Sequence, residues 1–326
     1  MESYQSPEVG RIPQKVLVTG GAGFVGSNLV RALLAIGDIK TVFVLDDLFT
    51  GSWENLPQDK RIDAVEGSVT DEVIVRKLVK EVGLVFHLAA RNIIASTKDP
   101  RNDFATNIGG TLTILLAARD LGRKKVVYSS SASVYGNPKH IPITEDEACY
   151  TLSPYAVSKL AGEHYCIAFY ESYGVPTVCV RYSNVYGPCQ DARNPYCGVV
   201  AKFFDALMND RAPMVHGDGQ QTRDFTYVED AVEATILAGL SDRAVGNVLN
   251  VGTGVETSVN DLAMIVAEIF GKTIKPEYIE RRDIDNIRRR VLNIERIRRV
   301  LRWSPRFTLR EGLRKTYEWF IDSKRR

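Results

Sequence analysis

Tyr155 and Lys159 are the two residues of this sequence whose types and spacing most directly indicate chemistry. They lie four positions apart in the run SPYAVSK at residues 153–159, and residues with that separation share one face of a helix. A phenol ionises near pH ~10 in water, which is too high for a base at neutral pH. A neighbouring ammonium group favours the phenolate, so the pair is suited to take a proton from a hydroxyl group. Spacing alone leaves an ordinary surface pair on an amphipathic helix equally open.

The local sequence favours a helix around this pair. Ser153 is a suitable N-cap and Pro154 suits the first helical turn. Tyr135 and Lys139 have the same spacing, but a glycine and a proline lie between them and would break a helix. We therefore expect only the first pair to be held on one helical face.

Ser131 is a third candidate, because it follows an apolar run expected to be a strand, Lys125–Ser130. In parallel α/β sheets, ligands bind beside the carboxyl ends of the strands. A hydroxyl group at such an end can hydrogen-bond the same oxygen that Tyr155 deprotonates. Ser129 and Ser130 are equally compatible with ordinary polar residues at a strand end.

The run KVLVTGGAGFVG at residues 15–26 predicts a dinucleotide site. Gly20 permits a sharp turn after a buried strand, Gly23 leaves room for a pyrophosphate, and Gly26 lets the next helix lie close to the sheet. The first N–H groups of that helix favour phosphates. Asp46 ends the next apolar run, where its carboxylate can accept hydrogen bonds from ribose and repel a 2′-phosphate. This order of elements favours NAD over NADP, whereas a glycine pattern alone would fit a simple loop.

The remaining elements must position these groups. Further strands are expected at Ile62–Glu66, Leu84–Leu88, Thr177–Arg181 and Val248–Val251, and helices at Asp71–Glu81, Gly110–Leu121, Ala156–Tyr173, Asp261–Phe270 and Arg310–Ser323. Alternating strands and helices predict an α/β fold with a Rossmann-type doubly wound parallel sheet and a smaller C-terminal substrate-binding lobe. We expect residues 1–182 to bind the dinucleotide, with a returning strand near 248–251, and residues 183–326 to form most of an interleaved substrate lobe.

Composition excludes several functional classes. The formal net charge of +2 over 326 residues does not suggest nucleic acid or an anionic membrane surface as a partner. No apolar stretch is long enough to span a bilayer, and residues 1–14 lack an apolar signal core. The five cysteines form no CxxC pair, which predicts reduced thiols in a cytoplasmic protein. The histidines have no metal-ligand spacing, so no metal is expected.

Motifs along nearly the whole chain are similar to those of one family. They are TGGAGFVG, LDDLFTG, FHLAA, ATNIGGT, YSSSASVYG, SPYAVSK, RYSNVYGP, GDGQQTRDFTYVED, NVGTG and LRWSP with LREGLRKTYEWF. In this order and spacing they resemble the extended short-chain dehydrogenase/reductase family, in its nucleotide-sugar epimerase and dehydratase branch. The resemblance is greatest to UDP-glucose 4-epimerase-like members.

The resemblance implies roles for individual residues. The catalytic group would be Ser131, Tyr155 and Lys159. Contacts to NAD would come from Gly20, Gly23, Phe24, Val25, Gly26, Asp46, Ser68, Val69, Leu88, Ala89, Ala90, Asn107, Ser129, Tyr155, Lys159 and Tyr182. Substrate contacts would come from Ser131, Ser133, Tyr155, Asn184, Arg223, Arg282 and Arg288.

Some of these positions depart from the family pattern. Ser68 stands where the family usually has an aspartate near adenine, so only a neutral hydrogen bond is expected there. The run RRDIDNIRRR at residues 281–290 replaces the usual Arg-x-Gly-Asp. Arg282 and Arg288 suit a bidentate contact with a diphosphate, but a solvated basic loop fits them as well. Arg290 falls near the position that limits sugar size in the epimerases.

The resemblance also implies a reaction. Tyr155 would take a proton from a sugar hydroxyl while hydride passes to NAD, leaving a 4-keto sugar and bound NADH. The family's 4,6-dehydratases carry an Asp-Glu pair after the catalytic hydroxyl and its decarboxylases a glutamate, whereas this chain has Ala132 and Ser133. We therefore expect a UDP-sugar 4-epimerase acting on UDP-glucose or UDP-N-acetylglucosamine. The alternatives are a dehydratase, a decarboxylase, a UDP-glucuronate 4-epimerase, or a non-catalytic NAD-binding protein. A homodimer through Gly110–Leu121 and Ala156–Tyr173 is expected from the resemblance alone.

Overall fold

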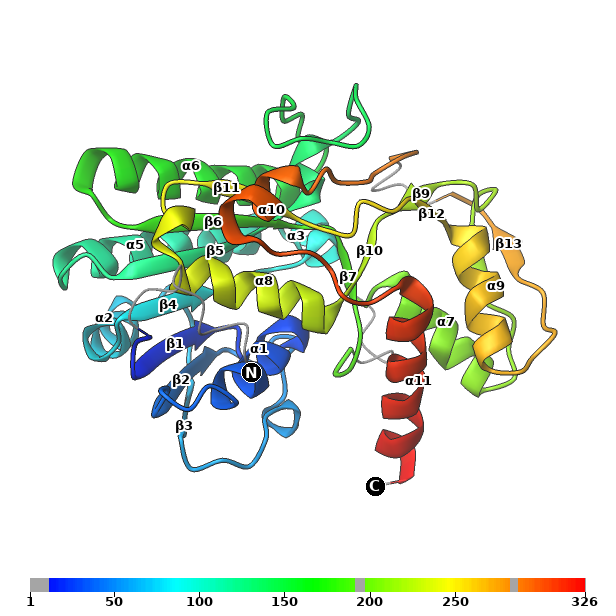
Figure 1. The fold of residues 1–326 in the computed structure, drawn as a ribbon, viewed down its shortest axis with the longest axis horizontal. Helices are drawn as coiled ribbons and strands as arrows, with labels where there is room; N and C mark the ends of the chain where they lie inside the picture. Colours follow the sequence, from blue (N-terminus) through cyan, green and yellow to red (C-terminus); the bar gives the residue numbers. More distant parts are fainter. Residues whose placement is uncertain (1–11, 191–196, 282–286, 326) are drawn as a thin grey trace.

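A seven-stranded parallel sheet forms the centre of the protein (Figure 1). The computed structural model describes residues 12–190, 197–281 and 287–325. The strands follow the order β11-β6-β5-β4-β1-β2-β3. Their bounds are β1 Lys15–Thr19, β2 Thr41–Asp46, β3 Ile62–Glu66, β4 Leu84–His87, β5 Lys125–Ser131, β6 Thr177–Tyr182 and β11 Val248–Val251. Because every pair is parallel, all the carboxyl ends lie at one edge of the sheet, as a doubly wound fold requires.

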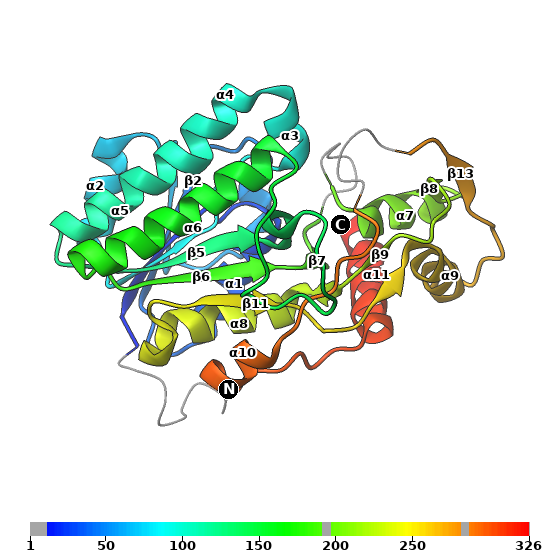
Figure 2. The same ribbon diagram turned by 90° about the horizontal axis from the view of Figure 1, so that it is seen from above.

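Helices cover both faces of the sheet (Figure 2). One layer contains α2 Glu72–Glu81, α5 Gly110–Asp120 and α6 Pro154–Tyr173, and the other contains α1 Phe24–Leu34 and α8 Val228–Leu240. Successive residues of β1 serve the two layers in turn: Leu17 packs with the first, and Val16 and Val18 pack with the second. A strand buried on both faces must be apolar throughout, which explains the runs that mark the strands in the sequence.

The C-terminal part extends from the carboxyl side of the sheet, at the right in Figure 2. It contains the helices α7 Val199–Met208, α9 Val259–Ile269 and α11 Leu309–Arg325, and both α7 and α11 contact α9. Its short strands are β8 Met214–His216, β9 Thr222–Arg223, β12 Thr257–Ser258 and β13 Glu277–Ile279, which pair as β13 with β8 and β12 with β9. Two further strands, β7 Asn184–Tyr186 and β10 Phe225–Tyr227, pair with each other. Helix α10 Glu295–Leu301 contacts α8 and β11.

Short helical segments follow several of the strands. After β4 come α3 Ile93–Lys98, α4 Pro100–Asp103 and the π-helical turn η3 Phe104–Gly109, which continues directly into α5. The 3₁₀ turns are η2 Trp53–Asn55, η4 Ala132–Tyr135 and η5 Asp242–Ala244. A π-helical turn is uncommon and is often found beside a functional site, and here η3 contains Asn107.

The expected sheet is confirmed, with differences at the ends of the elements and five missed helices. Strand β4 ends one residue before Leu88, β5 continues to Ser131, and α6 begins at Pro154 rather than Ala156. Helices α3, α4, α7, α8 and α10 were not expected from the sequence. None of the five cysteines, all of which lie within the described ranges, forms a disulfide. No helix within the described ranges is both long and apolar enough to cross a membrane.

Candidate active site

The start of α6 places Tyr155 and Lys159 together. The Ser153 hydroxyl accepts a hydrogen bond from the Ala156 N–H at 3.2 Å, and Pro154 occupies the first turn, as the sequence predicts. Tyr155 is half-buried and lies on the same helical face as Lys159, whose Nζ is 5.9 Å from the centroid of the tyrosine ring. Tyr135, by contrast, ends the turn η4 and donates from its hydroxyl to Asn250 Oδ1 at 2.7 Å.

Ser131 is brought to the same edge by β5, of which it is the last residue. Its Oγ accepts a hydrogen bond from the Ser133 N–H at 3.1 Å and lies 3.2 Å from Ser133 Oγ. Lys159 ties α6 to this strand end, because its Nζ donates to the Ser129 carbonyl oxygen at 2.6 Å. Strand β5 and helix α6 therefore supply one hydroxyl, one phenol and one amine at a common edge.

The amine of Lys159 is buried, with 3% of the residue exposed. Burial lowers the pKa of Lys159 to about 8, while the negative charges of Asp103 and Glu163 oppose that shift. The amine is therefore still mostly protonated at neutral pH. A cation so close to Tyr155 stabilises the phenolate relative to the phenol.

Both carboxylates near Lys159 accept hydrogen bonds from other groups. Asp103 Oδ1 accepts from Ser96 Oγ at 2.5 Å, from Asn107 Nδ2 at 2.6 Å and from Ser158 Oγ at 3.0 Å. Buried charges are tolerated only with such partners. Oδ1 of Asp103 is therefore occupied by three protein donors.

Glu163 is the second of these carboxylates, and it belongs to a buried ion pair. Its two oxygens accept from Arg181 Nε at 2.9 Å and Nη2 at 2.6 Å, and Ser130 Oγ also donates to it. A two-pronged pair of this kind is strong and geometrically specific. Ser130 is accordingly used in holding α6 to the sheet.

Asn107 acts on the loop that follows β4. Its Oδ1 accepts from the Arg91 N–H at 2.7 Å, and its Nδ2 donates to the Arg91 carbonyl oxygen at 3.1 Å and to Asp103. Because the amide is engaged by protein groups, Asn107 is placed to position the loop 88–91 rather than to offer a free amide.

The glycine turn lines a hollow at the carboxyl ends of β1, β2 and β4. Ten of the predicted cofactor residues line it: Gly20, Gly23, Phe24, Val25, Gly26, Asp46, Val69, Leu88, Ala89 and Ala90. Gly20 has φ +69°, and a Cβ on it would lie 2.7 Å from the Ala89 nitrogen. No side chain caps the start of α1 at Gly23, so its first N–H groups suit a pyrophosphate. The residues present therefore fit a dinucleotide.

Asp46 connects the glycine turn to the loop that follows β2. Its carboxylate accepts from the Ala22 N–H and the Leu48 N–H, both at 2.9 Å. Burial raises the pKa of Asp46, and these two hydrogen bonds act in the opposite direction. The geometry holds the carboxylate beside the hollow, where the sequence predicts the ribose.

The other predicted cofactor residues do not line this hollow. Ser68 Oγ lies 2.8 Å from Thr70 Oγ1 and accepts from the Thr70 N–H, so its hydroxyl is used within its own turn. Ser129 contributes its carbonyl oxygen to Lys159. The hydroxyl of Tyr182 is 2.6 Å from Thr235 Oγ1. Tyr155 and Lys159 lie at the end of β5 as described above.

His87 has a structural role. It is 1% exposed, and burial together with the charge of Lys159 lowers the pKa of His87 to about 3. Thr111 donates to the Asn107 carbonyl oxygen and therefore accepts from His87 Nε2 at 3.0 Å, which leaves Nδ1 to accept from Thr19 at 2.7 Å. The neutral ring connects β1, β4 and α5.

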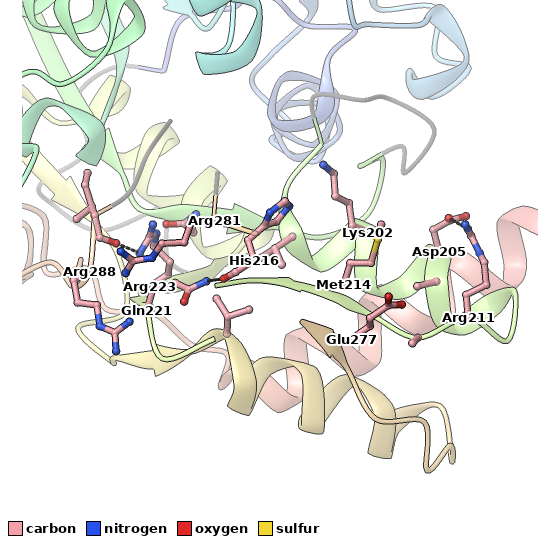
Figure 3. Close-up of a pocket in the computed structure, with 16 residues that line it drawn as sticks. Lys202, Asp205, Arg211, Met214, His216, Gln221, Arg223, Glu277, Arg281 and Arg288 are labelled. Atoms are coloured by element: carbon pink, nitrogen blue, oxygen red, sulfur yellow. Dashed lines mark hydrogen bonds and ion pairs between the residues drawn. The ribbon is translucent and has the colours of Figure 1, made fainter. Parts of the chain in front are cut away.

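A second cavity, of about 670 Å³, lies in the C-terminal part (Figure 3). Asn184 and Arg223 line it from β7 and β9, and Arg288 lines it from the segment after β13. Arg223 is 8% exposed, and its Nη1 donates to the carbonyl oxygens of Thr222 and Ile287, both at 2.8 Å. Arg288 Nη1 is 2.8 Å from Asp218 Oδ1. Arg282 lies outside the described residues.

Other residues of this cavity were missed by sequence reasoning. Figure 3 shows Lys202, His216, Gln221 and Arg281 around it in addition to the predicted arginines. Lys202 comes from α7 and His216 from β8. Guanidinium and ammonium groups from several elements suit a diphosphate. The sequence shows that these residues are polar or charged, but it does not show that they come together in one cavity.

The strand order places the catalytic candidates between the two hollows. Strand β5 lies between β4, whose following residues 88–90 line the glycine hollow, and β6, which leads to Asn184 in the second cavity. Ser131 therefore lies at the junction. Within the described ranges, no cluster of three or more His, Cys, Asp or Glu side chains is arranged to hold a metal.

Comparison with known proteins gives a consistent result. The family model described as "NAD dependent epimerase/dehydratase family" matches residues 16–252. The UDP-glucose 4-epimerase of Mycolicibacterium smegmatis is 40% identical over 312 residues, which cover 94% of this chain and 98% of that protein.

Solved structures agree. The UDP-glucose 4-epimerase of Thermotoga maritima with UDP-glucose superposes with a TM-score of 0.89 at 36% identity, covering 95% of this chain and 99% of that one. The UDP-N-acetylglucosamine 4-epimerase of Methanobrevibacter ruminantium in complex with UDP-N-acetylmuramic acid gives a TM-score of 0.90 at 36% identity, with the same coverage.

Similarity also extends to relatives with other reactions. A UDP-N-acetyl-alpha-D-glucosaminuronate decarboxylase of Bacillus cytotoxicus is 31% identical, covering 94% of this chain and 98% of that protein. The human dTDP-D-glucose 4,6-dehydratase is 31% identical, covering 96% and 92%. The match of sequence and fold over nearly the whole length, together with a dinucleotide hollow at the expected edge, makes this chain a member of the NAD-dependent epimerase/dehydratase family of nucleotide-sugar enzymes, with NAD as its cofactor.

Proposed function

We propose that this protein is a UDP-sugar 4-epimerase of the UDP-glucose or UDP-N-acetylglucosamine type. The turn η4 favours epimerisation over dehydration and decarboxylation. It follows Ser131 with Ala132, which is buried, and Ser133, whose hydroxyl is hydrogen bonded to that of Ser131. Neither residue can act as the additional acid or base that loss of water or of carbon dioxide would require.

The nearest carboxylates support the same choice. Asp103 accepts three hydrogen bonds, and Glu163 is paired with Arg181. A carboxylate committed in this way is a poor proton carrier for a sugar carbon. Among the described residues at the end of β5, Tyr155 is the group that we expect to transfer the proton.

Each residue of the catalytic group has a separate role in this reaction. NAD, when bound, supplies the acceptor and later the donor of the hydride exchanged with the sugar. Tyr155 takes the proton from the sugar 4-hydroxyl and later returns it to the same oxygen, which gives the opposite epimer. Ser131 orients that oxygen. The positive charge of Lys159 stabilises the phenolate of Tyr155 relative to the phenol. A 4-keto sugar that is free to rotate within the cavity can receive hydride on either face.

Two parts of the chain hold the two ligands in this scheme. Residues 1–182, together with the returning strand β11, bind NAD. The remainder binds the nucleotide sugar, with Asn184, Arg223 and Arg288 directed at the diphosphate. Their position in one cavity with Lys202 and Arg281 supports this assignment.

The reaction can be tested with three substrates. Purified enzyme with UDP-glucose, UDP-N-acetylglucosamine or UDP-glucuronate should give the 4-epimer of at least one of the first two, detected by proton NMR. Epimerisation of UDP-glucuronate alone would favour the glucuronate epimerase instead. Release of water or carbon dioxide without any epimer would refute the proposal.

We further propose that the protein forms a homodimer through α5 and α6. Helix α6 exposes Val157 and Tyr165, at 50% and 37%, and these residues are eight positions apart on one face. Exposed apolar residues on a shared face often mark an interface. Sedimentation equilibrium should give twice the chain mass of 36.3 kDa.

The proposed interface can be tested by substitution. Val157→Arg should shift the protein to the monomer, whereas Met264→Arg, on the similarly exposed Met264 of α9, should leave the dimer intact. A wild-type monomer at micromolar concentration would contradict the dimer.

A further inference from the structure

An ion pair between Asp47 and Arg91 lines the cofactor hollow, and the reaction described above does not use it. Arg91 Nη2 lies 2.6 Å from Asp47 Oδ2, and Nη1 lies 3.3 Å from Oδ1. The Arg91 guanidinium carbon is also 4.2 Å from the centroid of the Phe49 ring. All three residues line the hollow that contains the glycine turn. We call Asp47, Phe49 and Arg91 the clasp.

The clasp bridges two strands that are not neighbours. Asp47 follows β2 and Arg91 comes four residues after the end of β4, while β1 lies between these strands in the sheet. Strands separated by one neighbour are roughly 10 Å apart. The ion pair therefore spans the carboxyl end of β1, where the glycine turn begins. A dinucleotide with its pyrophosphate on that turn and its ribose at Asp46 must lie next to the clasp.

The two halves of the clasp are held differently. The backbone N–H and carbonyl of Arg91 are both bonded to Asn107, and Arg91 Nε is 3.3 Å from Asn102 Oδ1. Asp47 belongs to a loop in which Leu48 has φ +56° and Phe49 is 42% exposed. A left-handed conformation is unfavourable for a leucine. Asp47 Oδ1 also accepts from the Phe49 N–H at 3.2 Å, so Asp47 is held within its own short loop, whereas Arg91 is anchored to Asn102 and Asn107.

The ion pair is also shielded from solvent. The side chains of Arg91 and Asp47 are 12% and 28% exposed, so salt screens their attraction less than that of a surface pair. The ring of Phe49 covers the guanidinium and adds a cation–π contact.

We propose that the clasp controls the exchange of NAD: the Asp47–Arg91 pair must open before the cofactor leaves or enters. Closed, it retains a cofactor that has to return the hydride it accepts. This role depends on NAD binding alone, so it holds whichever reaction of the family the enzyme carries out.

The exchange rate of the cofactor tests this role. Enzyme loaded with radiolabelled NAD is mixed with excess unlabelled NAD, and the label that remains bound is followed by rapid gel filtration. Asp47→Asn and Arg91→Gln should each release label roughly 5- to 10-fold faster than the wild type, as expected for a two-pronged, partly buried pair. The double variant should be no faster than the faster single variant, because both changes open the same contact.

A matched control comes from a second ion pair. Arg76 Nη1 lies 2.9 Å from Asp120 Oδ2, between α2 and the end of α5, so Arg76→Gln should leave the release rate unchanged. Raising the salt from about 0.05 M to about 0.5 M should speed release from the wild type less than either substitution does, because a partly buried pair is only weakly screened.

Two results would overturn the proposed role of the clasp. One is wild-type release rates in both single variants, each shown to be folded by an unchanged melting temperature and full NAD stoichiometry. The other is a double variant whose acceleration equals the product of the two single effects. If Arg91→Gln fails to fold, the release rate of Asp47→Asn compared with that of Arg76→Gln decides the question alone.

Discussion

Tyr155→Phe should lower kcat by about a thousand-fold while NAD binding and the melting temperature stay close to those of the wild type. The change removes one hydroxyl from a half-buried ring and leaves the contacts of the ring in place. General acid–base groups contribute typically 10²- to 10⁴-fold to rates. Tyr155 would also act twice in each turnover, once as base and once as acid. Single-turnover formation of the 4-epimer, followed by NMR or a coupled assay, measures the loss.

A control for this substitution lies on the same helix. Tyr173, the last residue of α6, is 45% exposed and packs its ring edge-on against Phe169 at 5.0 Å. Tyr173→Phe keeps that ring contact, so kcat should remain within about two-fold of the wild type. If Tyr155→Phe retained more than a tenth of wild-type kcat, another group would have to transfer the proton, and Tyr155 would be left with a binding role.

The features that could be predicted from the sequence depend on neighbouring residues. The glycine turn, its strand and its helix lie within residues 15–34, and ten of the residues expected there do line one hollow. The cap Ser153 and the pair Tyr155 and Lys159 lie within seven positions. Local patterns of this kind fix their own geometry, since strand and helix periods are set over a few residues.

Helix α8 shows why other elements could not be predicted. All of its residues except Glu229 and Leu237 are buried, because it lies between the sheet, α1 and α10. A helix buried on nearly every side has no polar stripe, so the 3.6-residue pattern that identifies surface helices is missing. Helix α7 does have such a stripe, but it follows a segment rich in proline, asparagine and glycine that suggests only loops.

Long-range contacts account for the parts of the site that were missed. The second cavity collects Lys202, His216, Arg223 and Arg281 from separate segments of the chain. The partners Asp47 and Arg91 of the clasp are 44 positions apart. Nothing in either local sequence indicates the other, because only the order of strands β4, β1 and β2 brings them together.

Gly26→Ala should weaken NAD binding by roughly 100-fold or more and lower the stability of the protein by about 1–3 kcal/mol, the usual cost of overpacking. A Cβ at this position would lie 2.1 Å from the Gly20 carbonyl oxygen and 2.7 Å from the Gly21 Cα. Both are backbone atoms of the turn itself, so no side chain can rotate away. Helix α1 would have to move off the turn, and its first N–H groups would no longer point at the pyrophosphate.

Gly37→Ala is the matched control for this change. It is the same substitution at an exposed glycine near the end of α1, where a Cβ would meet no atom within 4 Å. Alanine at a compatible position is neutral or slightly stabilising, because it restricts the unfolded chain. Titration calorimetry with NAD, together with thermal unfolding, separates the two effects. Wild-type NAD affinity in Gly26→Ala would mean that the dinucleotide does not lie on the glycine turn, and the assignment of the hollow would then fail. A loss of affinity in Gly26→Ala alone ties the cofactor to the point where α1 leaves the sheet.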